Sequence, residues 1–270
     1  GQKMNVFLRK DVKNMGRIIT IANQKGGVGK TTTAINLSAC LAEAGQHVML
    51  VDFDPQGNAS SGLGVEIEEH EHTVYDLMAE EAGLDECLVK NVQDNLDVLP
   101  SDMNLAGAEI EFQEIENKET LLKRYLHQVR DDYDFILIDC PPSLNILTIN
   151  ALTAADTVLV PIQCEYYALE GLNQVLKTVE LVRKKLNPQL ELEGVVFTMY
   201  DARTNLSLQV VESVKSNLNQ TIYKTIIPRN VRLAEAPSFG MTINMYDDKS
   251  TGAIAYEALA KEVIALDKKK

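Results

Sequence analysis

A glycine-rich segment near the amino end has residue types that can hold the phosphates of a nucleotide; it reads Gln24-Lys25-Gly26-Gly27-Val28-Gly29-Lys30-Thr31-Thr32. An apolar run at residues 18–22 leads into it, and a helical pattern begins at Lys30. Glycines let backbone N–H groups turn towards anionic oxygens, and a helix N-terminus adds partial positive charge. Gln24 stands where the usual G-x-x-x-x-G-K-[ST] pattern has its first glycine. The order of strand, glycines, lysine, threonines and helix still favours a nucleotide site over a glycine turn without a ligand.

The residues of this segment have distinct expected roles. Lys30 is the candidate for holding the β- and γ-phosphates, Thr31 for direct coordination of Mg²⁺, and Thr32 for the α-phosphate side. The candidate nucleotide loop is completed by Gly26, Gly27, Val28 and Gly29. The residue types alone do not decide the role of Lys25. A lysine beside the loop is either a solvated side chain on its rim or a further phosphate contact.

Two expected strands end in carboxylates. Residues 47–52 run into Asp52-Phe53-Asp54, and residues 135–139 end at Asp139, which is followed by Cys140-Pro141-Pro142-Ser143. Ligands of open α/β sheets bind at the carboxyl ends of the strands. Asp139 is therefore the candidate Mg²⁺ partner through water, and Asp54 the candidate that approaches the metal through water and orients the attacking water. For Asp52, the sequence is compatible both with a structural role, in which the carboxylate caps backbone N–H groups, and with a catalytic role.

The pattern along the chain predicts an α/β fold. Short apolar runs alternate with amphipathic stretches of helical length, which is typical of a mainly parallel, twisted sheet with helices on both faces. Expected strands are residues 17–23, 47–52, 96–99, 135–139, 157–161, 195–199 and 222–227. Expected helices are residues 30–44, 120–130, 146–155, 169–186, 206–218 and 253–266.

Length and composition favour one domain over residues 15–267. A chain of 270 residues that is 45% hydrophobic can bury a large core without disulfides. Its four cysteines form no C-x-x-C pair, and no apolar run approaches the roughly 20 residues of a membrane span, so we expect a soluble cytoplasmic protein. Residues 1–14 precede Met15-Gly16, which reads like a natural start, and are expected to be an N-terminal extension or a cloning remnant. Residues 268–270 form a short basic tail.

Charge is distributed unevenly. The net charge is −13, but residues 66–119 contain 17 Asp and Glu against two Lys, a balance of −15 that leaves +2 for the rest of the chain. We interpret the acidic stretch as a solvated elaboration between core strands. Residues 200–232 instead carry five basic side chains against two acidic ones, Arg203, Lys215, Lys224, Arg229 and Arg232 against Asp201 and Glu212. A basic segment in an acidic chain is a candidate surface for nucleic-acid phosphates, the alternative being scattered surface arginines.

Several motifs together resemble the ParA/MinD ATPases, and in particular the chromosomal ParA or Soj branch of that family. The resemblance covers nearly all of residues 15–267. Residues 25–31 match the deviant Walker A motif of the family. The other matching segments are Asp54-Pro55-Gln56-Gly57-Asn58, Asp139-Cys140-Pro141-Pro142-Ser143, Gln163-Cys164-Glu165-Tyr166-Tyr167-Ala168-Leu169-Glu170-Gly171, Asp201-Ala202-Arg203-Thr204-Asn205 and residues 227–237.

The resemblance implies a switch driven by ATP and Mg²⁺ in chromosome or plasmid partitioning. Monomers bind ATP, pair face to face with nucleotide between them, and bind double-stranded DNA without sequence preference on the nucleoid, until a ParB-type centromere-binding protein stimulates an otherwise weak hydrolysis. Lys25 is implied to reach the phosphates held by the other subunit, which makes it a catalytic and nucleotide-contacting residue together with Lys30. Pro228 and Asn230 match adenine-side positions, and Arg203 and Arg232 match DNA-binding positions.

Three alternatives belong to other functional classes. A MinD-like membrane-associated ATPase that positions the division machinery needs a basic amphipathic tail, whereas residues 253–266 have the pattern of a core-packing helix. A metal-cluster carrier needs cysteine ligands, and Cys140 has no second cysteine at a suitable spacing. A nucleotide-gated binding module with incidental hydrolysis also fits, because the motifs contain no evident arginine finger.

Overall fold

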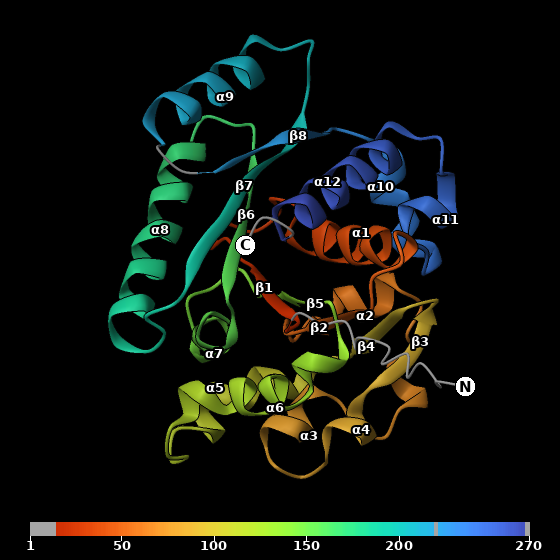
Figure 1. The fold of residues 1–270 in the computed structure, drawn as a ribbon, viewed down its shortest axis with the longest axis vertical. Coiled ribbons are helices and arrows are strands. Elements are labelled where there is room, and N and C mark those ends of the chain that lie inside the picture. Colours follow the sequence, from red (N-terminus) through yellow and green to blue (C-terminus); the bar gives the residue numbers. More distant parts are fainter. Residues whose placement is uncertain (1–14, 219–220, 268–270) are drawn as a thin grey trace, which may run out of the picture.

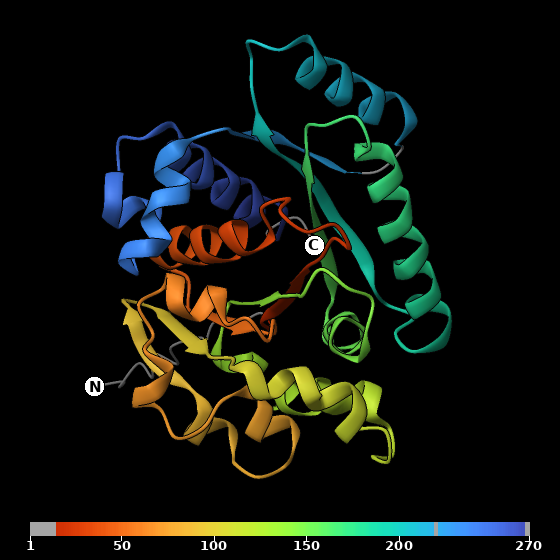
Figure 2. The ribbon, with the colours of Figure 1, turned by 180° about the vertical axis from the view of Figure 1, so that it is seen from behind.

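The computed structural model describes residues 15–218 and 221–267. One eight-stranded sheet runs through the molecule in the order β3-β4-β2-β5-β1-β6-β7-β8 (Figures 1 and 2). Its strands are β1 (Arg17–Ile21), β2 (Val48–Asp52), β3 (Val89–Gln93), β4 (Leu96–Leu99), β5 (Phe135–Asp139), β6 (Thr157–Gln163), β7 (Glu191–Tyr200) and β8 (Ile222–Pro228). All pairs are parallel except β3 with β4, so the expected α/β class and mainly parallel sheet are confirmed.

Helices cover both faces of this sheet. The longer ones are α1 (Lys30–Glu43), α6 (Leu121–Val129), α7 (Ile146–Ala154), α8 (Ala168–Lys185), α9 (Asn205–Asn217) and α12 (Thr251–Asp267). Helices α1 and α12 pack on one face, whereas α6, α7 and α8 cover the other (Figure 1). Successive strand residues point to opposite faces, so Ile18 and Ile136 join one core and Ile19 and Leu137 the other.

The expected elements agree with these bounds within a few residues, with β7 extending four residues further at its start. The sequence revealed neither the short helices nor the strand β3. Its residues are half-buried or exposed, and it pairs antiparallel with β4 at the edge of the sheet. A strand that is solvated on one side lacks the continuous apolar run by which the central strands were recognised. A positive φ of 53° at Asn91 further interrupts its pattern.

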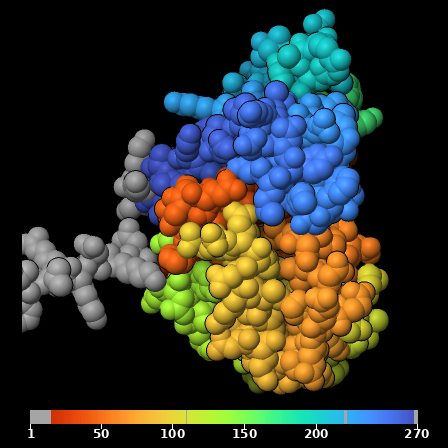
Figure 3. Space-filling view, turned by 90° about the vertical axis from the view of Figure 1, so that its right-hand side faces the viewer, coloured from red at the N-terminus to blue at the C-terminus, as the bar shows by residue number. Residues whose placement is uncertain are grey.

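The acidic stretch 66–119 builds one flank of the molecule. Besides β3 and β4 it forms short helices, which are η1 (Ile67–Glu69), α3 (Val74–Met78), α4 (Leu84–Cys87), η2 (Met103–Gly107), α5 (Ala108–Glu111) and η3 (Lys118–Thr120). Figure 3 shows part of this flank as a compact surface next to the segment that carries α11 (Ile243–Asp247). Its apolar side chains, including Leu77, Met78 and Phe112, are buried in the same core as the central strands. The stretch is thus a solvated elaboration on its outside and part of the core on its inside.

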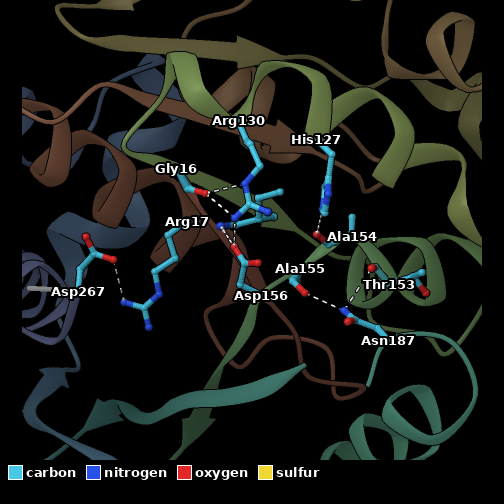
Figure 4. Close-up of polar contacts among 11 residues, drawn as sticks. Gly16, Arg17, His127, Arg130, Thr153, Ala154, Ala155, Asp156, Asn187 and Asp267 are labelled. Carbon is cyan, nitrogen blue, oxygen red and sulfur yellow. Dashed lines mark hydrogen bonds and ion pairs between the residues drawn. The ribbon is translucent and has the colours of Figure 1, made fainter. Parts of the chain in front are cut away.

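A group of polar contacts ties the elements together at the amino ends of the strands (Figure 4). Arg130 donates from Nε and Nη2 to the carbonyl oxygen of Gly16, at 3.1 and 2.7 Å, and from Nη2 to Asp156 at 2.8 Å. The Asn187 amide donates to three carbonyl oxygens at the end of α7. This edge is opposite to the carboxyl ends of the strands, so it holds the sheet without taking part in the candidate site. Among the described residues, no helix is long and apolar enough to cross a membrane.

Candidate nucleotide and magnesium site

The central strands bring the sequence-predicted segments together. Strands β2, β5 and β1 are neighbours in the sheet and parallel, so their carboxyl ends lie along one edge. The glycine-rich loop follows β1, the Asp54 loop follows β2, and the Pro141-Pro142 turn follows β5. Asp52 and Asp139 are direct partners in the β2–β5 register. Segments up to 108 residues apart, such as those of Thr31 and Asp139, therefore meet at one edge of the sheet, the position at which open α/β sheets bind ligands.

The glycine-rich loop has the backbone geometry of a phosphate cradle. Gly27 and Gly29 have φ values of 73° and 90°, a region that side chains other than glycine rarely adopt. Thr198, near the end of β7, donates its hydroxyl to the carbonyl oxygen of Val28 at 2.7 Å and so fixes the loop from a strand two positions away from β1 in the sheet. Helix α1 begins directly after Gly29, which directs its free N–H groups towards the loop.

Lys30 points into this loop. Its Nζ donates to the carbonyl oxygen of Lys25 at 2.8 Å, and the residue is only 6% exposed. Burial lowers the pKa of Lys30, while the carboxylates of Asp139 and Asp54 act in the opposite direction. A buried ammonium group that has a single backbone acceptor is well placed to exchange that acceptor for phosphate oxygens.

Thr31 and Asp139 form the candidate magnesium position. The Thr31 hydroxyl donates to Asp139 Oδ2 at 2.8 Å. Asp139 is completely buried, and its Oδ1 has no hydrogen-bond partner among the described residues. Burial and then the nearby Asp52 charge raise the pKa of Asp139 well above its usual value. A buried acceptor without a partner beside a threonine hydroxyl fits a hydrated Mg²⁺ ion, which would satisfy the oxygen and favour its ionised form.

Asp54 and Asp52 have different environments although they are two residues apart. Asp54 is 8% exposed, and its Oδ1 accepts the Gln56 N–H at 3.0 Å, while Oδ2 accepts no hydrogen bond from the described part of the chain. Asp52 is completely buried, and its Oδ2 accepts both the backbone N–H and the hydroxyl of Ser60, at 2.8 and 2.6 Å. Asp52 thus caps the short helix α2 (Asn58–Gly62), which favours its structural role, whereas Asp54 keeps one oxygen for a ligand.

Lys25 lies outside the loop that it precedes. Its ammonium group forms an ion pair with Glu165, and the two side chains are 41% and 28% exposed. Glu165 follows β6, and Tyr166 and Tyr167 beside it are exposed by 79% and 61%. Sequence reasoning included Glu165 in a family motif without giving it a role. The available signal was its position four residues after the expected strand at residues 157–161.

A separate cavity of about 180 Å³ opens beside the loop. Gly29 and Thr32 line it from the phosphate side and Pro228 and Asn230 from the end of β8, and its remaining walls include Tyr256. The structure therefore brings the two adenine-side candidates to the glycine-rich loop. The Asn230 side chain accepts the Leu233 N–H at 3.3 Å and donates to Thr251 at 2.7 Å, so it caps α10 (Val231–Glu235). Because the Asn230 side-chain amide is already hydrogen-bonded, an adenine base in this cavity would contact the backbone around Asn230 instead.

The two DNA candidates follow adjacent strands. Arg203 precedes α9 after β7, and Arg232 lies in α10 after β8. The strands are parallel neighbours, and the Arg229 N–H donates to the Tyr200 carbonyl at 2.9 Å, which joins the two loops. Lys215 lies in the last turn of α9, about 15 Å further along the helix at 1.5 Å per residue. Lys224 lies within β8 rather than at its carboxyl end.

Cys140 does not resemble a metal ligand. It is buried, and burial raises the pKa of its thiol well above the usual value, so the thiol remains protonated. The described residues contain no group of three or more His, Cys, Asp or Glu side chains that could hold a metal ion. The expectation of a small buried side chain is consistent with this environment.

A parallel sheet, a glycine-rich loop that leads into a helix, a buried lysine and a strand-end aspartate paired with a threonine define a P-loop nucleoside triphosphatase. Comparisons with known proteins agree with this class. A family profile described as an AAA domain matches residues 16–192. The chain superposes with a TM-score of 0.83 on a Mycobacterium smegmatis structure described as cobyrinic acid a,c-diamide synthase with bound ATP analog and magnesium, which is 37% identical, with 94% of this chain and 96% of that one covered.

Full-length relatives define the family more closely. The chain is 58% identical over 251 residues to the sporulation initiation inhibitor protein Soj of Bacillus subtilis, covering 93% of this chain and 99% of that protein. It is 51% identical over 253 residues to the chromosome-partitioning ATPase Soj of Treponema pallidum, covering 94% and 99%. The chain belongs to the Soj/ParA family of P-loop ATPases, which confirms the resemblance seen in the motifs.

Proposed function

We propose that this ATPase is a partitioning switch whose ATP-bound form is a sandwich dimer that binds DNA. The observation that carries the proposal is the separation of the two lysines. Lys30 is buried inside the phosphate loop, whereas Lys25 is half-exposed on its rim, where its ammonium group pairs with Glu165. A second subunit that presents its own nucleotide can therefore attract Lys25 without displacing Lys30. Such a contact exists only in the ATP dimer, and it supplies the differential affinity that a switch requires.

The residues around the γ-phosphate position divide the catalytic work. Thr31 would bind Mg²⁺ directly and Asp139 and Asp54 through water, while Lys30 and the loop backbone hold the phosphates. Mg²⁺ supplies charge neutralisation on the phosphates when it is bound. Asp54 would orient the attacking water with its free Oδ2. Turnover is slow until a ParB-type partner binds, because no arginine finger is evident in the motifs.

DNA binding is assigned to Arg203 and Arg232. Both are exposed in the segments that follow the adjacent strands β7 and β8, and dimerisation doubles the set. Contacts of this kind reach phosphates and read no bases, which fits binding without sequence preference. We place the protein on the nucleoid in the cytoplasm, with residues 15–267 acting as one ATPase domain.

A MinD-like role at the membrane is the alternative. Its main requirement is an amphipathic helix with a free apolar face. Residues 251–267 form α12, whose Ala253, Tyr256, Leu259 and Val263 are buried against α1 and the sheet. The apolar face of this helix is already used in the core, which favours DNA as the surface partner.

The test measures assembly and DNA retention in parallel. Light scattering and binding to a nonspecific duplex are recorded with ATP, ADP or no nucleotide, over a series of salt concentrations. The proposal expects dimers and salt-sensitive DNA binding with ATP alone. Lys25→Ala should keep ATP binding but lose both ATP-dependent dimerisation and DNA binding. Lys177→Ala, on the surface of α8, is the matched control and should keep all three. If the ATP form instead sediments with anionic vesicles and does not bind DNA, the MinD-like role at the membrane is established.

A further inference from the structure

Both arginines that are assigned to DNA are already paired with carboxylates of their own subunit. Arg203 is paired with Asp201, and Arg232 with Glu235 and Asp247. Arg229 lies between them on the β8 loop, is also exposed, and forms no ion pair with the described residues. The two arginines that match DNA-binding positions thus have direct ion pairs, whereas Arg229 acts on Asp201 only through its nearby charge.

The Arg203 pair is a closed two-residue turn. Asp201 Oδ1 accepts Arg203 Nε at 2.9 Å and the Arg203 backbone N–H at 3.0 Å, while Oδ2 accepts Nη2 at 2.7 Å. One complete edge of the guanidinium is therefore occupied, although the arginine side chain is 86% exposed. These hydrogen bonds lower the pKa of Asp201 to about 2, so the carboxylate keeps its charge.

Arg232 is held in a small cage. Its Nη1 lies 3.1 Å from Glu235 and its Nε 3.5 Å from Asp247, and its guanidinium carbon lies 5.9 Å from the centre of the Tyr246 ring. Tyr246 in turn donates to Glu235 at 2.9 Å. Two carboxylates and an aromatic face thus direct this guanidinium towards its own subunit.

A phosphate has to compete with these partners. The affinity of a basic surface for DNA depends on the number of phosphates that it neutralises, and an arginine that is neutralised internally contributes less. Exposed ion pairs are weak, so DNA can displace them, but each displacement reduces the net free energy that the arginine contributes to binding. One subunit has two such arginines and a dimer has four.

We propose that Asp201, Glu235 and Asp247 are competing ligands of Arg203 and Arg232 that weaken DNA binding by a single subunit and make retention depend on two. The inference rests on the proposed DNA-binding function. It assigns a role to three further carboxylates. They lower the affinity of this surface for a polyanion and increase the difference in affinity between one subunit and the dimer.

Asp201→Asn is the decisive variant. The asparagine oxygen can still accept the Arg203 backbone N–H, so the turn before α9 is kept. The negative charge is lost, and the amide NH₂ group in place of Oδ2 cannot accept the Nη2 hydrogen bond, so the guanidinium is held more weakly. With ATP, we expect the affinity for a 40-base-pair duplex to rise about 3- to 10-fold, and the salt dependence to become steeper by up to about one phosphate contact per subunit. With ADP the variant should bind detectably where the original protein does not.

Controls separate release of the arginine from a change in net charge. Glu212→Gln on α9 and Asp248→Asn beside Asp247 each remove one exposed carboxylate that has no ion pair among the described residues, and they should change affinity less than twofold. Asp201→Asn combined with Arg203→Ala should bind no better than Arg203→Ala alone. Glu235→Gln repeats the test at Arg232.

The outcomes distinguish this inference from the function on which it rests. If DNA binding depends on ATP and Arg203 but Asp201→Asn binds equally or more weakly, the carboxylate positions the arginine and the inference is overturned. An equal gain in the Glu212→Gln control also overturns it. If the original protein binds no DNA, the proposed function fails at its DNA step. Retention of the same variants on a heparin column then decides the inference, because Asp201→Asn must still elute later than Glu212→Gln.

Discussion

At the scale of residues, the site separates charged groups that the sequence places side by side. Lys25 and Lys30 belong to one short motif, yet one forms an ion pair on the rim and the other is buried in the loop. Asp52 and Asp54 likewise divide into a helix cap and a carboxylate with a free oxygen. The residue types and spacing predicted the candidates, while the partners that distinguish them, such as Glu165 for Lys25 and Ser60 for Asp52, are known only from the structure.

Asp52 provides a pH dependence that can be measured. Burial raises the pKa of Asp52 to about 6, despite its hydrogen bonds from Ser60. Since the unfolded value is about 4, the folded state retains the proton between these values, and the stability that this contributes is lost as pH rises through 6. Asp52→Asn cannot ionise, so its free energy of unfolding relative to the original protein should increase by up to about 3 kcal/mol from pH 4 to 7. Urea unfolding across this range measures the difference.

The matched control for that series is Asp85→Asn, whose side chain is 92% exposed in the original protein. Its difference from the original protein should stay nearly constant over the same pH range. A flat difference for Asp52→Asn as well would mean that Asp52 remains ionised when buried.

Asp54→Ala tests the assignment of the attacking water. Because Asp54 has no hydrogen bond from the loop lysines in the described structure, its loss should leave ATP affinity within about threefold, while hydrolysis falls about 100-fold or more. The variant should therefore persist as an ATP-bound dimer on DNA. Single-turnover hydrolysis and nucleotide retention measure the two effects. A variant that no longer retains ATP or DNA would show that Asp54 is needed for binding rather than for hydrolysis.

At the scale of elements, the strands that were predicted most easily are those buried on both faces. Continuous apolar runs marked β1, β2, β5 and β6, because each of their side chains packs under a helix. The edge strand β3 and the short helices had no such signal. Their conformation depends on packing against the rest of the core through residues such as Val74 and Leu105.

Asn187 tests one junction between elements. Its amide donates to the carbonyl oxygens of Leu152, Thr153 and Ala155, at 3.0, 3.2 and 2.8 Å, and so closes the end of α7 (Figure 4). Asn187→Ala should lower the free energy of unfolding by about 1–3 kcal/mol. Asn187→Asp should cost more, because a carboxylate then faces three carbonyl oxygens. Thermal and urea unfolding measure both, and equal losses would contradict the proposed hydrogen bonds. ATP affinity should not change, since the junction lies opposite to the site.

At the scale of the whole molecule, charge is divided between regions. The acidic stretch includes β3 and β4 at one edge of the sheet, whereas Arg203 follows β7, the second strand from the other edge. With a Debye length of about 8 Å at physiological salt, charges that are this far apart act nearly independently. A net charge of −13 is therefore compatible with a surface that binds DNA.

This arrangement predicts which basic residues matter. Arg203→Ala and Arg232→Ala should each weaken DNA binding by the ATP form and lower its salt dependence by about one phosphate contact per subunit. Lys215→Ala, at the far end of α9, should change affinity less than twofold. Binding to a labelled duplex over a salt series compares the three variants, with ATP-dependent dimerisation as the control for folding. A loss with Lys215→Ala equal to that with Arg203→Ala would extend the surface along α9.

The sequence by itself determined the fold class, the phosphate loop and the family, because these depend on local signals: apolar runs, glycines that need positive φ, and a fixed spacing of lysine, threonine and aspartate. It did not determine which groups pair. The contacts of Lys25 with Glu165, Thr31 with Asp139 and Thr198 with Val28 join residues that are 108 or more positions apart. Only the sheet order brings them together, since parallel strands collect at one edge whatever follows each of them in the chain. The tertiary structure alone therefore decided that one lysine is buried at the phosphates and the other is held outside by a carboxylate.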